Sequence, residues 1–221
     1  MLALIFDLDG TLIDSVYAHV LAWQKSFTAG GMLVPAWSIH HKIGLGGLEL
    51  ALAIGRELGR SVSADEAEEL DKRHGAIMNE LLPYPEPLPG AAALLHRLRE
   101  MHVPWGIATS GDRSGVEKAL RSLGLSNNVT VVCKSDVDHA KPEPDVFLAC
   151  RERLNILARD CFVVGDAVWD MLAARRAGML GIGVLTGGIG RTELIEAGAY
   201  RIYGDPAEID AKRYELGLVI G

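Results

Sequence analysis

Short apolar runs alternate with longer amphipathic segments along most of the chain. The apolar runs are continuous, which is typical of strands buried on both faces in a parallel sheet covered by helices. They predict strands at Leu2–Phe6, Val103–Ala108, Val129–Cys133, Cys161–Val164 and Ile182–Leu185. Apolar residues at helical spacing predict helices at Ala91–Met101, Ser114–Leu123, Asp145–Leu154 and Ala167–Ala177. This alternation indicates an α/β fold whose parallel sheet core is flanked by helices.

One stretch breaks the alternation directly after the first predicted strand. It contains helical patterns but no convincing strand, and the helices are expected at Ser15–Ala29, Gly47–Leu58 and Ala64–Leu82, the last with Ser63 as its N-cap. The proline-rich segment Pro83–Gly90 follows, which neither continues a helix nor donates to a central strand. We therefore expect a helical domain of residues 14–84 inserted into a core of residues 1–13 and 85–221. The alternative is that these helices only pad the sheet.

Composition and charge narrow the classes of partner. The chain has 221 residues, 49% of them hydrophobic, with a formal net charge of −7, so a surface for nucleic acid or an anionic membrane is not expected. The three cysteines are scattered, which suits a reducing compartment. The apolar run at the N-terminus is too short for a signal peptide or a membrane span, so a cytoplasmic location is expected. We take a monomer as the default and a dimer as the alternative.

Two aspartates, Asp7 and Asp9, directly follow the first predicted strand and precede Gly10 and Thr11. They lie at the strand-to-loop corner, where α/β folds place their ligands. Residues two apart on an extended chain point the same way, so the carboxylates repel each other and a divalent cation would relieve that repulsion. An ordinary acidic turn, with Asp14 capping the next helix, is the alternative.

A second pair of carboxylates follows the strand at Cys161–Val164. Asp166 ends that strand, and Asp170 lies one helical turn later on the same helix face. Favourable charge at a helix N-terminus explains one of these acidic residues better than it explains both.

A hydroxyl pair, Thr109 and Ser110, follows the strand at Val103–Ala108, ahead of a helix whose cap would be Asp112 or Ser114. Hydroxyls and free amides at a helix N-terminus suit a phosphoryl group, although capping alone would account for them.

Lys141 is bracketed by Ala140 and the segment Pro142-Glu143-Pro144. A lysine fixed near carboxylates and a phosphate neutralises charge in a transition state, whereas a solvated loop lysine is the alternative. The order of these features along the chain, each near the end of a predicted strand, carries more weight than any one of them.

The set Asp7-x-Asp9-Gly10-Thr11, Thr109, Lys141 and Gly165-Asp166-x-x-x-Asp170 resembles the four motifs of the haloacid dehalogenase superfamily. The resemblance covers nearly the whole chain. The helical insert is similar to that of the branch with an α-helical cap domain, which includes phosphoglycolate-phosphatase-like enzymes and β-phosphoglucomutase. It implies a Rossmann-like core, Mg²⁺ as the cofactor and a small phosphorylated metabolite as the substrate.

The resemblance also implies a role for each matching residue. Asp7 would attack phosphorus to form an aspartyl-phosphate, and Asp9 would act as general acid and then general base, for which its pKa should lie above that of Asp7. Gly10, Thr109, Ser110 and Lys141 would contact the phosphoryl group. Mg²⁺ would be bound by the carboxylates of Asp7, Asp166 and Asp170 and by the backbone carbonyl of Asp9.

Substrate specificity would come from the cap. His19 and Trp23 resemble residues of the first cap helix of β-phosphoglucomutase, although a lone histidine on a helix is more often structural. Gly44, Leu45 and Gly46 would face the substrate, and Trp37, His40 and His41 are further candidates for the pocket. The glycines of this loop and the proline-rich return segment suggest a cap that swings closed.

Three other functions remain alternatives. The loop Ile43–Gly47 lacks the arginine with which the mutase holds its second phosphate, so hydrolysis is favoured over a mutase. A phosphonatase would need a desolvated cap lysine, and nothing marks Lys25, Lys42 or Lys72 as one. A non-catalytic member of the family usually loses a motif residue, whereas this motif set is complete.

Overall fold

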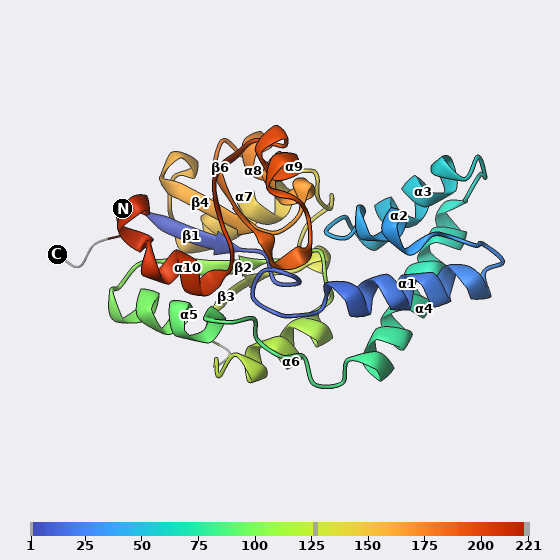
Figure 1. The fold of residues 1–221 in the computed structure, drawn as a ribbon, viewed down its shortest axis with the longest axis horizontal. Helices are drawn as coiled ribbons and strands as arrows, with labels where there is room; N and C mark the ends of the chain where they lie inside the picture. The colour runs from blue at the N-terminus through green and yellow to red at the C-terminus, as the bar shows by residue number, and fades with distance from the viewer. Residues whose placement is uncertain (1, 126–127, 219–221) are drawn as a thin grey trace.

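The computed structural model describes residues 2–125 and 128–218. Within them, six parallel strands form one sheet in the order β3-β2-β1-β4-β5-β6 (Figure 1). The strands are β1 (Ala3–Phe6), β2 (Trp105–Ala108), β3 (Thr130–Val132), β4 (Cys161–Gly165), β5 (Leu180–Val184) and β6 (Ala199–Tyr203). The expected α/β fold is confirmed.

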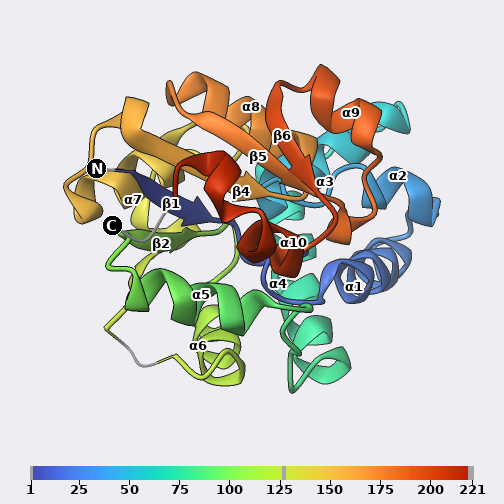
Figure 2. The ribbon, with the colours of Figure 1, turned by 60° about the vertical axis from the view of Figure 1, so that its left-hand side comes forward.

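Helices cover both faces of the sheet, which explains the unbroken apolar runs. In β1, Leu4 and Phe6 belong to one apolar cluster and Ala3 and Ile5 to another, because successive side chains point to opposite faces. The helices α5 (Ala91–Glu100), α6 (Arg113–Ser122) and α10 (Pro206–Ala211) lie on the first face; α7 (Asp145–Leu154) and α8 (Val168–Arg176) lie on the second. The short helix α9 (Arg191–Glu196) packs beside α8 and β6 (Figure 2).

Between β1 and α5 lie the three helices that were expected, α1 (Val16–Ala29), α3 (Gly47–Glu57) and α4 (Ala64–Leu81), and a further short helix, α2 (Ala36–His40). They share their own apolar cluster, which includes Phe27, Ile54 and Leu70, and they lie together at one end of the molecule (Figure 1). Ser63 caps α4 by accepting a hydrogen bond from the N–H of Glu66, as predicted. The domain boundaries at residues 13/14 and 84/85 remain our proposal.

The differences from the sequence-based elements are local. The edge strand β6 was not predicted, because its residues are mostly half-buried and form no continuous apolar run. The short helices α2, α9 and α10 were also not predicted, since each is too short to establish a periodicity. The cap of α6 is Asp112, whose carboxylate accepts from the N–H of Gly115, whereas Ser114 donates its hydroxyl to that same carboxylate.

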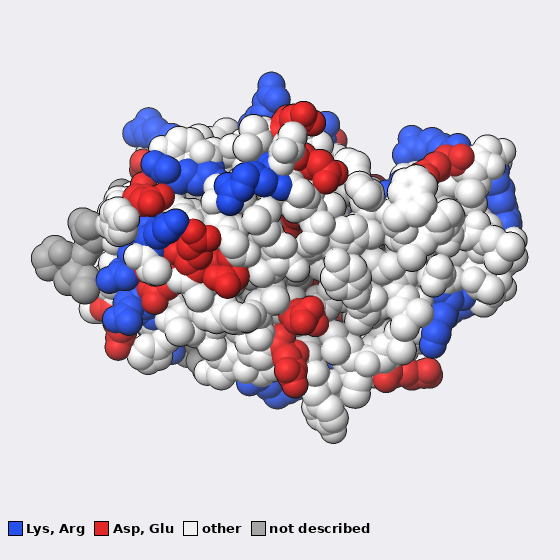
Figure 3. All heavy atoms as spheres, viewed as in Figure 1, with Lys and Arg blue, Asp and Glu red and all other residues white. Residues whose placement is uncertain are grey.

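Acidic and basic side chains are interspersed on the face drawn in Figure 3, and the outline is indented where the inserted helices meet the sheet. No helix among the described residues combines the length and the apolarity that a membrane span requires. The cytoplasmic location stays a prediction.

Candidate active site

The carboxyl ends of three adjacent strands bring the predicted motif residues together. Asp7 follows β1, Thr109 follows β2 and Asp166 follows β4, and β1 lies between β2 and β4 in the sheet. Because parallel strands end at the same edge, residues far apart in sequence become neighbours there. The N–H of Asp7 donates to the carbonyl of Val164 at 2.8 Å, which fixes the start of this loop against β4.

A buried lysine lies at the centre of this edge. Lys141 Nζ donates to Asp7 Oδ1 at 2.5 Å and lies 2.9 Å from Asp170 Oδ1, and the Lys141 side chain has no solvent exposure. Its ammonium also lies 5.0 Å from the centroid of the Phe147 ring. Lys141 is therefore a fixed internal cation, not a solvated loop lysine.

Three buried carboxylates surround this lysine, and ligand oxygens of Asp7, Asp166 and Asp170 all lie within 4.8 Å of one another. Asp166 Oδ1 accepts from the Thr11 hydroxyl at 2.8 Å. Asp170 Oδ2 accepts from the backbone N–H of Ala167, and its buried Oδ1 lies 2.9 Å from the Lys141 ammonium. Carboxylate oxygens are the ligands that hard divalent cations prefer, so this group fits a divalent metal ion.

Charge in the cluster is only partly balanced by the lysine. Burial, with a smaller contribution from Asp170, raises the pKa of Asp7 to about 7 although Lys141 opposes the shift. Burial and the neighbouring carboxylates also raise the pKa of Asp166 well above its ordinary value. Burial disfavours the charged form of Lys141, but Asp170 and Asp7 outweigh it and raise the lysine's pKa. A bound cation would favour the ionised carboxylates.

Asp9 has different surroundings, although it is only two residues from Asp7. Its Oδ1 accepts from the Ser15 hydroxyl at 2.6 Å and lies 3.2 Å from His19 Nε2. Burial alone would raise the pKa of Asp9, but His19 and Ser15 lower it to about 2. The expected order of the two pKa values is therefore reversed, because Asp9 receives two hydrogen-bond donors while Asp7 faces another carboxylate. The Asp9 carboxylate is not one of the three described carboxylates whose oxygens lie within 4.8 Å of one another.

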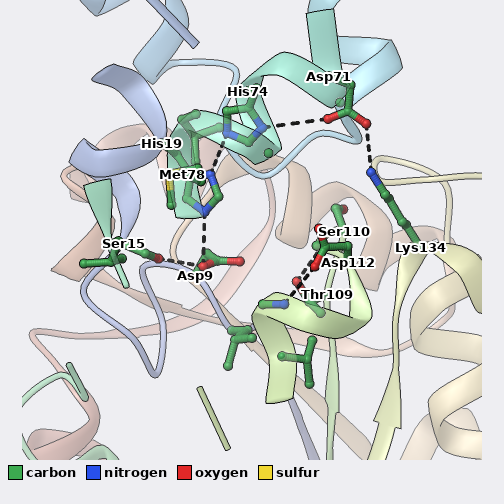
Figure 4. A pocket seen from close by; sticks show the side chains of 18 of the residues that line it. Asp9, Ser15, His19, Asp71, His74, Met78, Thr109, Ser110, Asp112 and Lys134 are labelled. Atoms are coloured by element: carbon green, nitrogen blue, oxygen red, sulfur yellow. Dashed lines mark hydrogen bonds and ion pairs between the residues drawn. The ribbon is translucent and has the colours of Figure 1, made fainter. Parts of the chain in front are cut away.

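Between this edge and the inserted helices is a cavity of about 660 Å³, with Asp7, Asp9 and Thr109 among its lining residues (Figure 4). Of the predicted specificity residues, His19, Trp23, Gly44 and Leu45 line it and Gly46 does not. Cavities of a few hundred to about 1,000 Å³ are typical of small-molecule sites.

Of the predicted phosphate-binding residues, Thr109 and Ser110 line this cavity, whereas Gly10 and Lys141 are not among its described lining residues. Thr109 Oγ1 accepts from the N–H of Gly111 at 2.9 Å, while Ser110 donates its hydroxyl to the carbonyl of Gly44 at 3.2 Å. Ser110 thus joins the sheet edge to the inserted loop. Gly10 has a φ of +79°, and a Cβ there would collide with the Asp166 carboxylate, so the turn requires glycine.

Trp37, His40 and His41 lie outside the lining of the cavity within the described part of the chain, which corrects their expected place in the pocket. His40 Nε2 lies 2.7 Å from the carbonyl of Gly187, and His41 Nε2 lies 3.6 Å from Glu193. They contact the core beside the site because α2 ends against the loop after β5. Lys42 forms an ion pair with Glu57, so it is not a free cap lysine.

Asp71, His74 and Lys134 are among the residues of the cavity wall that were missed from the sequence. His74 is the most informative of them, because it continues the buried stripe of Ala67 and Leu70 on the otherwise charged helix α4. A histidine in an apolar stripe at spacings of three and four residues was the signal available in the sequence.

Comparisons with known proteins identify the family of the chain. Residues 1–178 match the family model described as haloacid dehalogenase-like hydrolase. The validoxylamine A 7′-phosphate phosphatase of Streptomyces hygroscopicus subsp. limoneus is 33% identical over 184 residues, 82% of this chain and 84% of that protein. The fructose-1-phosphate phosphatase of Escherichia coli K12 is 34% identical over 182 residues, 80% and 92% of the respective chains. The crystal structure of a hydrolase from Pseudomonas syringae is 40% identical with a TM-score of 0.95, covering 98% of this chain and 99% of its own.

Proposed function

The chain belongs to the haloacid dehalogenase-like hydrolase family and is a phosphatase, and we propose that it hydrolyses the monoester of a small phosphorylated metabolite through an aspartyl-phosphate on Asp7. One observation carries this proposal: the two carboxylates that line one cavity, Asp7 and Asp9, have different hydrogen-bond and ion-pair partners. Asp7 is paired with a buried lysine beside two further carboxylates, whereas Asp9 is bonded to Ser15 and His19. Such a division suits a nucleophile and a general acid–base.

In the first step, a carboxylate oxygen of Asp7 attacks phosphorus and the bond from phosphorus to the leaving oxygen breaks. His19 and Ser15 hold the pKa of Asp9 low in the free protein, so Asp9 must take up a proton as the substrate enters. The leaving oxygen then takes that proton from the carboxyl of Asp9, so an alcohol departs and Asp9 becomes a carboxylate. Lys141 lies against Asp7 throughout and compensates the negative charge that gathers at the phosphoryl group.

In the second step, the Asp9 carboxylate removes a proton from a water molecule whose oxygen attacks phosphorus. The bond between phosphorus and the Asp7 oxygen breaks, which releases inorganic phosphate and restores the Asp7 carboxylate. Asp9 holds a proton again, and the cycle is balanced.

Mg²⁺ is the proposed cofactor, held by Asp7, Asp166, Asp170 and the backbone carbonyl of Asp9. When bound, it would cancel charge on the phosphoryl oxygens and orient them for in-line attack. Three buried carboxylates whose ligand oxygens lie within 4.8 Å of one another, with a single lysine among them, support a divalent cation at this position.

A small ester is supported by the size of the cavity and by the relatives. Validoxylamine A 7′-phosphate and fructose 1-phosphate, named for two of them, are both small phosphate esters. Among the described residues that line the cavity there is no arginine, which favours a monophosphate over the bisphosphate that a mutase must hold.

The test is phosphate release from a panel of sugar phosphates, phosphoglycolate and nucleotides, with Mg²⁺ and with a chelator. We expect Mg²⁺-dependent release by the wild type and none by Asp7→Asn. A broad panel without any turnover would favour a non-catalytic protein. Conversion of β-glucose 1-phosphate to glucose 6-phosphate, primed by a trace of bisphosphate and without free phosphate, would favour a mutase.

A further inference from the structure

A loop of the core packs against Asp166, one of the three carboxylates of the proposed metal site. This loop, residues 185–188, directly follows β5 and begins with the 3₁₀ turn Leu185–Gly187. A Cβ on Gly187 would collide with the Asp166 carboxylate, so the backbone of the loop lies directly against that side chain. Glycine is required here because of this close approach. The loop therefore limits the positions that the Asp166 carboxylate can take.

The loop after β1 encloses the same carboxylate from another side. Asp166 Oδ1 accepts from the Thr11 hydroxyl at 2.8 Å, and the Asp166 carboxylate packs against Gly10. The two loops are also joined to each other, because Thr186 Oγ1 donates to the carbonyl of Gly10 at 2.5 Å. The orientation of the Asp166 carboxylate thus depends on both loops staying in place.

The inserted helices hold the loop at residues 185–188 from the cap side. His40, the last residue of α2, lies with its Nε2 2.7 Å from the carbonyl oxygen of Gly187. Because a carbonyl only accepts, Nε2 is the donor of this hydrogen bond. The His40 ring stacks on Tyr17 of α1 with 5.5 Å between the ring centroids and an interplanar angle of 3°. The Tyr17 hydroxyl packs against Gly188, where a Cβ would lie 2.6 Å from its oxygen. Two side chains of the cap therefore contact adjacent residues of the loop.

These contacts connect the cap to a proposed metal ligand in two steps, from His40 to Gly187 and from Gly187 to Asp166. A carboxylate that is already held in one orientation binds a cation more tightly than one that must first be ordered. Groups that orient the ligands of a metal from outside contribute to metal affinity for this reason. The position of the inserted helices should therefore influence the affinity of the carboxylate cluster for a cation.

We propose that His40 is a positioning residue of the metal site, which keeps residues 185–188 against Asp166 and so raises the affinity of the carboxylate cluster for a divalent cation. This inference rests on the proposed Mg²⁺ site. His40 acts through Gly187 and not by contact with the substrate, since it lies outside the described lining of the cavity. Because coupling between two sites is reciprocal, cation binding in turn favours the position of the cap in which His40 reaches Gly187.

Titration of the whole protein with Mg²⁺ alone, without substrate, tests the proposal. Backbone ¹H–¹⁵N NMR signals give the Kd and show that each variant is folded. His40→Phe keeps an aromatic ring against Tyr17 but removes the donor to Gly187. We expect its Kd for Mg²⁺ to rise about tenfold, the lower end of the loss of affinity that follows removal of an outer-shell partner. His40→Gln, whose amide can donate to the same carbonyl, should restore most of the affinity.

Two further variants separate the loop from the general attachment of α2. His41→Ala removes a neighbouring contact of α2 with the core, the pair with Glu193 at 3.6 Å, and leaves the loop at residues 185–188 unchanged. Its Kd for Mg²⁺ should stay within about twofold of the wild type. Thr186→Val removes the bond of the loop to Gly10 from the core side, so it should raise the Kd as His40→Phe does.

An equal rise of the Kd in His40→Phe and His41→Ala would overturn the proposal, because the effect would then come from a looser α2. A Kd of His40→Phe within about twofold of the wild type would overturn it as well. A wild type that binds no Mg²⁺ would refute the proposed metal site and this inference with it. A wild type that binds Mg²⁺ but hydrolyses no ester would refute the proposed hydrolysis alone, and the Kd values would still decide the role of His40.

Discussion

Lys141 Nζ lies 2.5 Å from Asp7 Oδ1, and both side chains are almost fully buried. The same ammonium lies 2.9 Å from Asp170 Oδ1. One internal cation thus serves two carboxylates, and the site depends on it for stability as well as for chemistry. Removal of one partner of a buried ion pair leaves a charge with no compensation.

Lys141→Met should therefore lower the free energy of unfolding, measured by urea denaturation with a chelator present, by about 3–5 kcal/mol. The matched control is Lys42→Met, which breaks the partly exposed pair with Glu57 and should cost at most about 1 kcal/mol. Equal losses of unfolding free energy in the two variants would show that the burial of Lys141 does not increase its contribution to stability.

Mg²⁺ should stabilise the wild type and not variants that lack a ligand. A ligand that binds only the folded state stabilises it by about 2.7 kcal/mol at a concentration one hundred times its Kd. We expect Tm to rise with Mg²⁺ in the wild type and to stay nearly constant in Asp166→Asn and Asp170→Asn. The exposed Asp138→Asn should respond as the wild type does. An unchanged rise in both ligand variants would contradict the proposed metal site.

The position of the site was predictable from the sequence, because the carboxyl ends of all strands of a parallel sheet lie at the same edge. Continuous apolar runs located β1, β2 and β4, and the polar residues that follow them had to meet at that edge. Lys141 was identified by its proline bracket, although its complete burial depends on the packing of α7 against the sheet. The motif residues therefore form one site as expected, while their individual roles stay proposals.

The wall of the cavity was less predictable. Asp71 and His74 belong to α4, and a helical pattern does not tell which face will lie over the sheet edge. His40 and His41 were candidates for the pocket whose direction was left open for the same reason, and in the structure they lie against Gly187 and Glu193. The reversed pKa order of Asp7 and Asp9 likewise depends on His19, whose ring reaches Asp9 only through the packing of α1.

His74 should make the stability of the protein depend on pH. Burial, the largest cause, depresses its pKa from 6.5 to about 4 in the folded state, so below pH 6.5 the unfolded chain binds a proton that the folded chain does not. The contribution is complete above pH 6.5 and is lost as the pH falls toward 4. The loss should approach about 3 kcal/mol, from about 1.4 kcal/mol per unit of pKa.

Urea denaturation at several pH values between 4 and 7 measures this dependence. His74→Gln should flatten the profile in that range, while the exposed His96→Gln should leave its slope unchanged. Asp7 and Asp166 have raised folded-state pKa values and give the opposite slope in this range, so the test is the difference in stability between the wild type and His74→Gln. A difference that does not change between pH 4 and 7 would contradict a depressed pKa of His74.

The inserted helices should swing relative to the sheet, because individual polar contacts join the two parts around the cavity. They include those of Ser110 with Gly44, His40 with Gly187 and His41 with Glu193. On one side Lys118 Nζ donates to Asn79 at 2.6 Å and Lys134 pairs with Asp71; on the other the Trp169 indole donates to the carbonyl of His41 at 3.2 Å. Partly exposed contacts of this kind are worth about 0–1 kcal/mol each, so an open form is energetically accessible.

Spin labels at Lys25→Cys on α1 and Arg99→Cys on α5 would measure this motion, since both positions are exposed and the three native cysteines are buried. Mg²⁺ with tetrafluoroaluminate, which mimics a phosphoryl group on Asp7, should narrow the distance distribution toward the closed form. The mimic brings charge to the floor of the cavity, which favours the state that excludes water. Asp7→Asn should show no narrowing, and one identical narrow distribution in the wild type with and without the mimic would rule out a swinging cap.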